Sequence, residues 1–233
     1  MSDLNARIWA GEKGYLTQAW GRYERSEKDA AALIAYLSAI YSIIGDAVAR
    51  FRNRNDSLIL RVVRLLGEMT EYLPELHLRV AQALNINPRD LTLDQAETLS
   101  AIFYRYSRWW FLGHCASWDR AEKIVRFALR EADYENGGHT LALLRLTLLK
   151  MEIEENGGEI ETEYLSRILF CVEEVAAKSD NPDQKSRVMR RMAEVYLMLE
   201  LPPMAQYALA VASAIPGISH GTRQKNLAMF RRT

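Results

Sequence analysis

The 233-residue chain lacks most features that would assign it to a specialised class of protein. Cysteine is scarce, since only Cys115 and Cys171 are present, so we expect no disulfide framework and a reducing compartment. Net charge is absent too: Lys and Arg together number 30, as do Asp and Glu, so no overall field favours a nucleic acid or a membrane. The longest apolar run, Ala30 to Gly45, covers about 16 residues and is short for a membrane span. These absences leave an ordinary folded protein that does not bind a membrane.

Sequence signals for catalysis or cofactor binding are equally scarce. The chain has neither a GxxxxGK[ST] nor a GxGxxG loop, so nothing supports phosphate binding by a glycine loop. His114 and Cys115 are adjacent, but neighbouring helical residues point about 100° apart and cannot act as base and nucleophile together. His77, His139 and His220 have no second ligand at helical spacing. We therefore predict no enzyme activity, no metal site and no cofactor.

A cluster of acidic residues surrounds the glycine pair 157–158. Its members are Glu152, Glu154, Glu155, Glu159, Glu161 and Glu163. Two interpretations stay open: a solvated helix end, which is the simpler one, and a site for a cation or a basic peptide.

The N-terminal segment, residues 1–27, is set apart by its aromatic residues. It contains Trp9, Tyr15, Trp20 and Tyr23 among several glycines, so its helicity is uncertain from sequence. We interpret it either as a docking arm or as part of the core. The segment begins MSDLNARIW, which is not the pattern of a signal peptide, and a cytoplasmic location is therefore expected.

The remainder, 28–233, shows helical periodicity almost throughout and no convincing alternating strand, which predicts a single all-α domain. Thr92 and Gln95 form a capping-box pattern, and Asn181 with Pro182 is a strong helix-start signal. Helices are predicted over 28–51, 56–72, 74–84, 92–112, 118–132, 139–155, 160–178, a pair from 182 to about 216, and 222–231. Because the loops between them are short, neighbouring helices should pair antiparallel.

The last helix pair, Val188 to Gly217, carries the clearest pattern. Its spaced positions are Ala193, Tyr196, Ala205, Leu209, Ala212 and Pro216. Small side chains allow close backbone approach, so Ala193 and Ala205 should mark the contact between the two helices. Pro202 and Pro203 stand between the helices, where proline can open the second.

This stretch resembles a tetratricopeptide repeat, although it lacks the Trp and Gly that the family has beside the first small residue. Ala121, Val125 and Ala128 repeat the pattern of Ala205, Leu209 and Ala212 at an interval of 84 residues, or two periods of about 42. The intermediate unit, Glu163 to Leu169, preserves little of it. The chain is therefore predicted to stack helical hairpins as a short solenoid of this type, or to form an irregular helical bundle.

The resemblance implies a concave groove, lined by the first helix of each pair, that binds a partner protein or peptide. The side chains proposed to anchor an acidic or C-terminal segment are Arg105, Arg108, Trp109, Arg187, Arg190 and Arg191. The predicted function is a non-catalytic interaction module or adaptor, and homo-oligomerisation stays open.

The alternative is a nucleic-acid-associated regulatory or packaging protein. It rests on the run Phe103 to Phe111, which interleaves aromatic rings with guanidinium groups suited to stack on bases and neutralise phosphates. The simpler interpretation of this run places one aromatic face in the core. The basic residues Arg50, Arg52 and Arg54 would add phosphate contacts.

Overall fold

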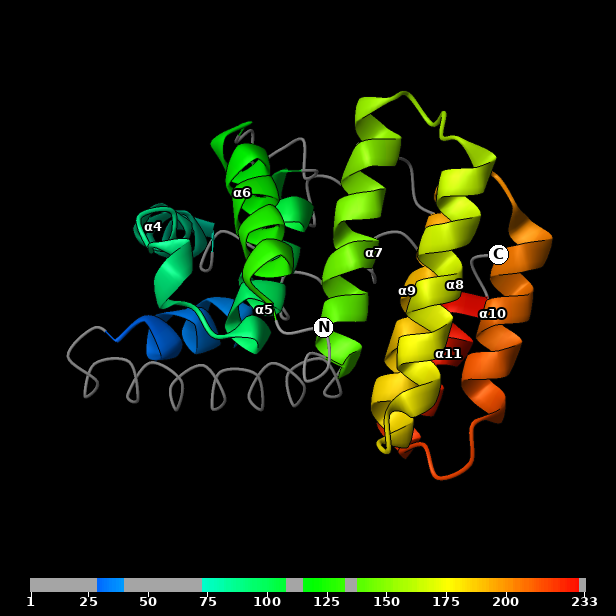
Figure 1. Ribbon diagram of the computed structural model, residues 1–233. Helices are drawn as coiled ribbons and strands as arrows, with labels where there is room; N and C mark the ends of the chain where they lie inside the picture. Colours follow the sequence, from blue (N-terminus) through cyan, green and yellow to red (C-terminus); the bar gives the residue numbers. More distant parts are fainter. Residues whose placement is uncertain (1–28, 40–72, 108–114, 133–137, 231–233) are drawn as a thin grey trace, which may run out of the picture. The chain divides into compact units, whose positions relative to one another are not determined.

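The computed structural model describes residues 29–39, 73–107, 115–132 and 138–230 (Figure 1). This part of the chain is helical and contains no strand, which confirms the all-α prediction. The aromatic segment 1–27, the predicted helix 56–72, Arg108 and Trp109 lie outside the described residues.

Contacts divide the chain into two compact units, Met1–Asp90 and Leu91–Thr233, and each is described by itself. The sequence predicted one domain over 28–233, and the division into two units does not test that prediction. In the first unit, residues 30–39 are helical, followed by α4 (Leu73–Ala83) and the 3-10 turn η1 (Pro88–Asp90). The Arg79 guanidinium lies 5.4 Å from the centre of the Tyr36 ring.

The second unit contains α5 (Leu93–Ser107), α6 (Cys115–Glu131), α7 (Gly138–Glu155), α8 (Thr162–Lys178), α9 (Pro182–Met198), α10 (Pro202–Ala214) and α11 (His220–Phe230). These bounds agree with the predicted helices to within about three residues wherever both ends are described, a normal uncertainty for helix ends.

Two of the predicted helix starts are built as expected. The Oε1 atom of Gln95 accepts from the Thr92 backbone N–H at 2.9 Å, and Thr92 Oγ1 accepts from the Gln95 N–H at 3.3 Å. Asn181 Oδ1 accepts from the backbone N–H groups of Asp183 and Gln184. Both caps satisfy donors that have no partner within the first helical turn, so α5 and α9 begin where the sequence indicates.

The helices of the second unit pack as successive hairpins (Figure 1). α5 packs against α6, α7 against α8, and α9 against α10, while the first helices α5, α7 and α9 also pack in sequence against one another. Each second helix contacts the next first helix, and α11 packs against α10 and α9. This arrangement is compatible with a helical solenoid.

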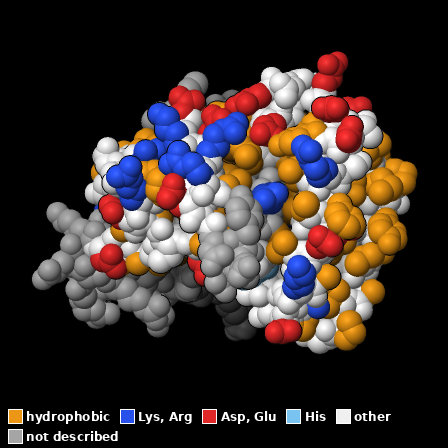
Figure 2. All heavy atoms as spheres, in the orientation of Figure 1, with side chains coloured by type: hydrophobic (Ala, Val, Ile, Leu, Met, Phe, Trp, Pro, Cys, Tyr) orange, Lys and Arg blue, Asp and Glu red, His pale blue; other side chains and the backbone are white. Residues whose placement is uncertain are grey.

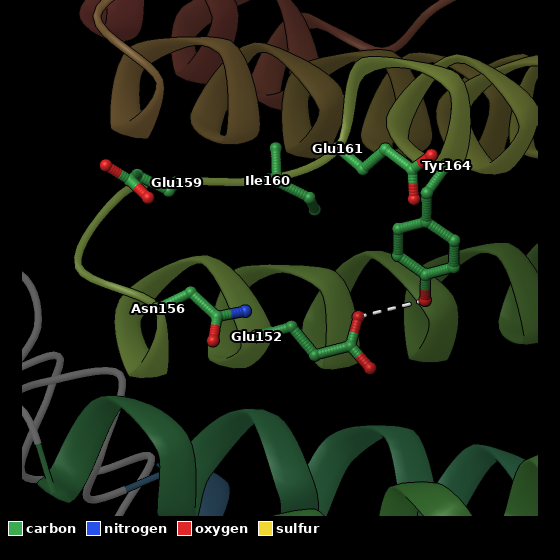
Figure 3. A pocket seen from close by; sticks show the side chains of 6 residues that line it. All are labelled: Glu152, Asn156, Glu159, Ile160, Glu161 and Tyr164. Atoms are coloured by element: carbon green, nitrogen blue, oxygen red, sulfur yellow. Dashed lines mark hydrogen bonds between the residues drawn. The ribbon is translucent and has the colours of Figure 1, made fainter.

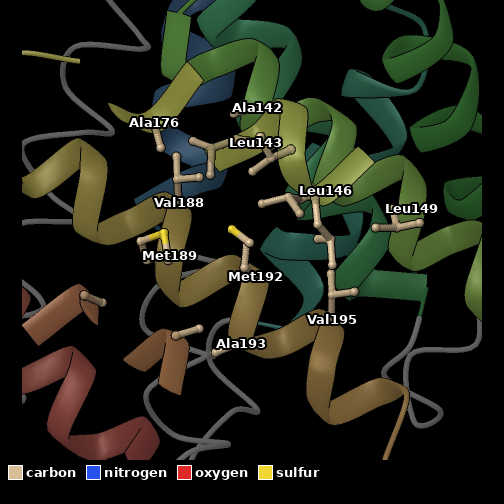
Figure 4. Close-up of a cluster of buried hydrophobic side chains, with 14 of the residues drawn as sticks. Ala142, Leu143, Leu146, Leu149, Ala176, Val188, Met189, Met192, Ala193 and Val195 are labelled. Carbon is tan, nitrogen blue, oxygen red and sulfur yellow. The ribbon is translucent and has the colours of Figure 1, made fainter. Parts of the chain in front are cut away.

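A cluster of buried hydrophobic side chains joins α7, α8, α9 and α10 (Figure 4). From α9, Val188, Met192 and Val195 are fully buried and face the apolar side of α7. Ala193 and Ala205 are also fully buried, as predicted for the contact between α9 and α10. Small side chains at these two positions let the helix backbones approach closely.

The 84-residue repeat falls on equivalent helices. Ala121, Val125 and Ala128 are buried on α6, and Ala205, Leu209 and Ala212 are buried on α10.

The helix between them, α8, does not follow the pattern. The corresponding positions are Glu163, Arg167 and Phe170, and all three are exposed. α8 instead buries Leu169, Val172 and Ala176. Its inward face is therefore out of register with the repeat, which explains why the intermediate copy is weak in the sequence.

Candidate functional site

The four described arginines among the predicted site residues come together in one charged cluster. We call it the first-helix cluster: Glu97 and Arg105 of α5, Lys150 of α7, and Arg187, Arg190, Arg191 and Glu194 of α9. Sequence reasoning did not identify its lysine or its two carboxylates. Arg108 and Trp109, which the sequence also proposed, lie outside the described residues.

Glu194 is the centre of this cluster. Its Oε2 accepts a hydrogen bond from Lys150 Nζ at 2.8 Å, and Arg191 Nη1 donates to both of its oxygens at 2.9 and 2.8 Å. Arg105 Nη2 approaches Oε1 at 3.5 Å. The Lys150 side chain is only 5% exposed, whereas that of Arg105 is 37% exposed. The Arg105 side chain is therefore accessible to solvent, whereas that of Lys150 is enclosed by the protein.

A register relationship explains why these groups meet. Arg105, Lys150 and Glu194 each lie 12 residues after the first residue of their helix. Because α5, α7 and α9 pack side by side, equivalent positions on them become neighbours. The helix starts predicted from sequence, 92, 139 and 182, place the three residues at unequal offsets, so the common register emerges only with the starts that the structure gives. Lys150 and Glu194 also carry no recognisable motif.

A second ion pair joins α5 to α9. Arg187 Nη2 donates to both carboxylate oxygens of Glu97, at 2.9 and 2.7 Å. The Glu97 side chain is 5% exposed and that of Arg187 is 39% exposed. In this pair α5 supplies the carboxylate, whereas in the Arg105–Glu194 pair α5 supplies the cation. Two ion pairs therefore connect α5 and α9, the helices on either side of α7, and each helix supplies one cation and one carboxylate.

Arg190 links the cluster to α11. Its Nη1 donates to Asn226 Oδ1 at 2.9 Å, and Asn226 Nδ2 donates to Ser186 Oγ at the same distance. Asn226 and Ser186 are fully buried. Burial lowers the pKa of Arg190, and the neighbouring Glu194 opposes that shift. The amide of Asn226 thus satisfies a partly desolvated guanidinium and holds α11 against α9.

The cluster carries an excess of positive charge. Among the described residues it contains five cations and two carboxylates. Burial alone would raise the pKa of Glu194, but attraction to Lys150 and Arg105 and the hydrogen bond from Lys150 outweigh it, so the pKa is lowered. Glu194 is therefore a carboxylate at neutral pH.

A buried aromatic ring of α5 contacts the lysine of the first-helix cluster. Lys150 Nζ lies 5.3 Å from the centre of the Tyr104 ring, and Tyr104 Oη donates to Glu154 Oε1 at 3.0 Å. Tyr104 is 2% exposed and Phe103 is fully buried. Both rings belong to the core, although they lie on different faces of α5 and the simpler interpretation placed only one aromatic face there. Buried in this way, they cannot stack on the bases of a nucleic acid.

The acidic turn between α7 and α8 forms a shallow pocket (Figure 3). It is lined by Glu152, Asn156, Glu159, Ile160, Glu161 and Tyr164. Tyr164 Oη donates to Glu152 Oε2 at 2.9 Å, and Arg126 Nη2 lies 3.8 Å from Glu152 Oε1. Burial and this hydrogen bond raise the pKa of Tyr164. No group of three or more His, Cys, Asp or Glu that could hold a metal ion occurs among the described residues.

None of the helices in the described ranges is both long enough and apolar enough to cross a membrane. Comparison of the chain with protein-family models, with curated proteins and with solved structures gives no match.

Proposed function

We propose that this protein is a non-catalytic interaction module that binds an acidic segment of a partner protein at the first-helix cluster. The observation that carries the proposal is the gathering of five cations and two carboxylates on the packed first helices α5, α7 and α9. A tetratricopeptide-like stacking of hairpins would present such a face as a continuous groove.

Two side chains are best placed to contact the partner. Arg105 and Arg187 are the partly exposed cations at the two bridges between α5 and α9. Only the Nη2 nitrogen of Arg187 bonds to Glu97, so its Nε and Nη1 groups carry no hydrogen bond within the described part of the chain. Guanidinium groups bind carboxylates through paired donors, which suits an Asp, a Glu or a terminal carboxylate of a partner.

The buried part of the cluster would give this surface its rigidity. Lys150 and Arg191 hold Glu194 from two helices, so the exposed guanidinium groups extend from a fixed base. A preorganised site loses less side-chain entropy on binding than a flexible one.

Affinity purification from the native host tests the proposal. Wild-type protein should retain a partner that Arg187→Gln and Arg105→Gln lose, because each variant removes one exposed charge without reversing it. Arg130→Gln is the matched control, since Arg130 is exposed on α6 and contacts Glu131 and the Phe127 ring of its own helix. Unfolding curves of all three variants establish that they are folded. If both cluster variants retain every protein that the wild type captures, the proposal fails.

The nucleic-acid alternative is separated by a mobility-shift measurement at two salt concentrations. Phosphate contacts release counterions, so nucleic-acid binding must weaken steeply as salt rises. A shift that depends on Arg105 and Arg187 and shows this steep slope would favour the alternative over a protein partner.

A further inference from the structure

The outer face of α8 carries a stripe of exposed residues that the core does not use. We call it the α8 stripe: Glu163, Arg167, Phe170, Glu174 and Lys178. At about 100° per residue these five positions lie within about 80° of one another around the helix. Phe170, at the middle of the stripe, is 61% exposed. An aromatic ring that is so exposed on an ordered helix is a candidate contact residue.

Helix α10, which packs against α9 as α8 does, adds exposed apolar groups. Its sequence from Pro202 to Ala214 contains no charged residue, and its Met204 and Tyr207 are 44% and 63% exposed. Leu201, directly before α10, is 42% exposed. Figure 2 shows hydrophobic side chains gathered over α8 and α10, on the right of the view. The exposed side of α10 is therefore uncharged, whereas the α8 stripe carries four charged residues at helical spacing.

The charges of the α8 stripe are arranged so that the stripe complements itself. Reading the stripe in both directions from its own midpoint, between 170 and 171, Arg167 mirrors Glu174, and Glu163 mirrors Lys178. Each mirrored pair therefore joins opposite charges. If two copies of α8 lie antiparallel about this midpoint, every charge of the stripe faces an opposite charge and the aromatic side chains meet at the centre.

The same charges could instead pair within one helix, because Glu163 and Arg167, and likewise Glu174 and Lys178, are four residues apart. Among the described residues, however, none of the four forms an ion pair within 4.0 Å. The Arg167 guanidinium instead lies 5.8 Å from the centre of the Tyr164 ring. All four charges are thus available to a partner.

We propose that the α8 stripe is a homodimer interface, in which α8 of a second copy of this chain packs antiparallel across a two-fold axis near Phe170. A two-fold interface requires a surface that is complementary to itself, and the mirrored charges meet that requirement. The apolar surface of α10 enlarges the contact on either side. This interface is separate from the first-helix cluster, so it goes beyond the proposed function and either one can stand without the other.

Charge reversal provides a sharp test because the predicted pairs are reciprocal. Arg167→Glu places like charges opposite each other twice per dimer, as does Glu174→Arg, and each variant should dimerise about 100-fold more weakly than the wild type. An equimolar mixture of the two single variants should recover the dimer, since both pairs then join opposite charges again. Analytical ultracentrifugation across the micromolar range measures these equilibria on the full chain.

Two further variants, one control and one within the stripe, show whether the effect belongs to this helix face. Arg130→Glu changes an exposed arginine on α6 and should leave dimerisation unchanged. Phe170→Ser should weaken the dimer without unfolding the monomer, because the ring is exposed. A wild-type chain that sediments as a monomer throughout this range overturns the proposal. So does a dimer that both single reversals leave intact, or a variant mixture that stays monomeric, because either result places the contact elsewhere.

Discussion

Lys150 Nζ lies 2.8 Å from Oε2 of Glu194, and this contact joins α7 to α9. The Lys150 side chain is only 5% exposed. The two residues occupy the same register position on adjacent helices. A buried ammonium is costly unless it is paired, so each group supports the charged form of the other.

Replacing Lys150 with Met should therefore destabilise the protein. The substitution keeps the aliphatic bulk but leaves Glu194 without its most buried partner, and we expect a loss of about 2 kcal/mol in the free energy of unfolding. Chemical denaturation measures it, with Lys123→Met, at an exposed position of α6, as the control. A Lys150→Met variant as stable as this control would show that the pair contributes nothing.

The same network predicts a pH dependence. Although burial raises the pKa of Glu194, its interactions with Lys150 and Arg105 lower it below the ordinary value. The folded state therefore favours the carboxylate, and this contribution is fully present above the unfolded pKa of about 4.3 and is lost as pH falls through the folded pKa. Denaturation curves below about pH 5 should show stability declining less for Glu194→Gln than for the wild type. Parallel pH profiles for the two proteins would contradict this assignment.

Asn226→Ala should loosen α11. The change leaves the Arg190 guanidinium and the Ser186 hydroxyl without the amide that joins them, at a cost of about 2 kcal/mol. Hydrogen exchange should accelerate in α11 before it does in α9, because α11 loses its buried polar anchor. Gln224→Ala, an exposed change on the same helix, is the control and should leave both rates unaltered.

Ala205→Leu tests the close approach of α9 and α10. Both Ala205 and Ala193 are fully buried, so the added side-chain volume must push the helices apart. We expect a destabilisation of about 2 kcal/mol, typical of overpacking. Ala210→Leu places the same side chain on the exposed face of α10 and should change stability little. Equal effects at the two positions would mean that α10 is not packed as described.

Local signals predicted the helices well, and the reason is visible at particular residues. The Thr92–Gln95 box and the Asn181 cap act through backbone groups within three residues, so they need no knowledge of the fold. The buried alanines of α6 and α10 follow helical spacing for the same reason. For α8 the repeat pattern is weak in the sequence, because the inward face of this helix is offset and places Phe170 outside.

The charged site was only half predictable. Arg105 and Arg187 could be proposed because arginine is the usual residue for binding carboxylates. Their intramolecular partners, Glu194 and Glu97, lie 89 and 90 residues away along the chain. No local pattern identifies which carboxylate such a guanidinium will reach.

The sequence by itself determined that this chain is helical, where several of its helices begin and which small residues mark the closest hairpin, because these properties arise from contacts within a few residues. Only the tertiary structure decided that α5, α7 and α9 align in register, so that Arg105, Lys150 and Glu194 meet. It also decided that α8 presents Phe170 and its mirrored charges outward. The physical reason is that burial and charge pairing depend on which helix faces pack together, and that choice is made by the whole core.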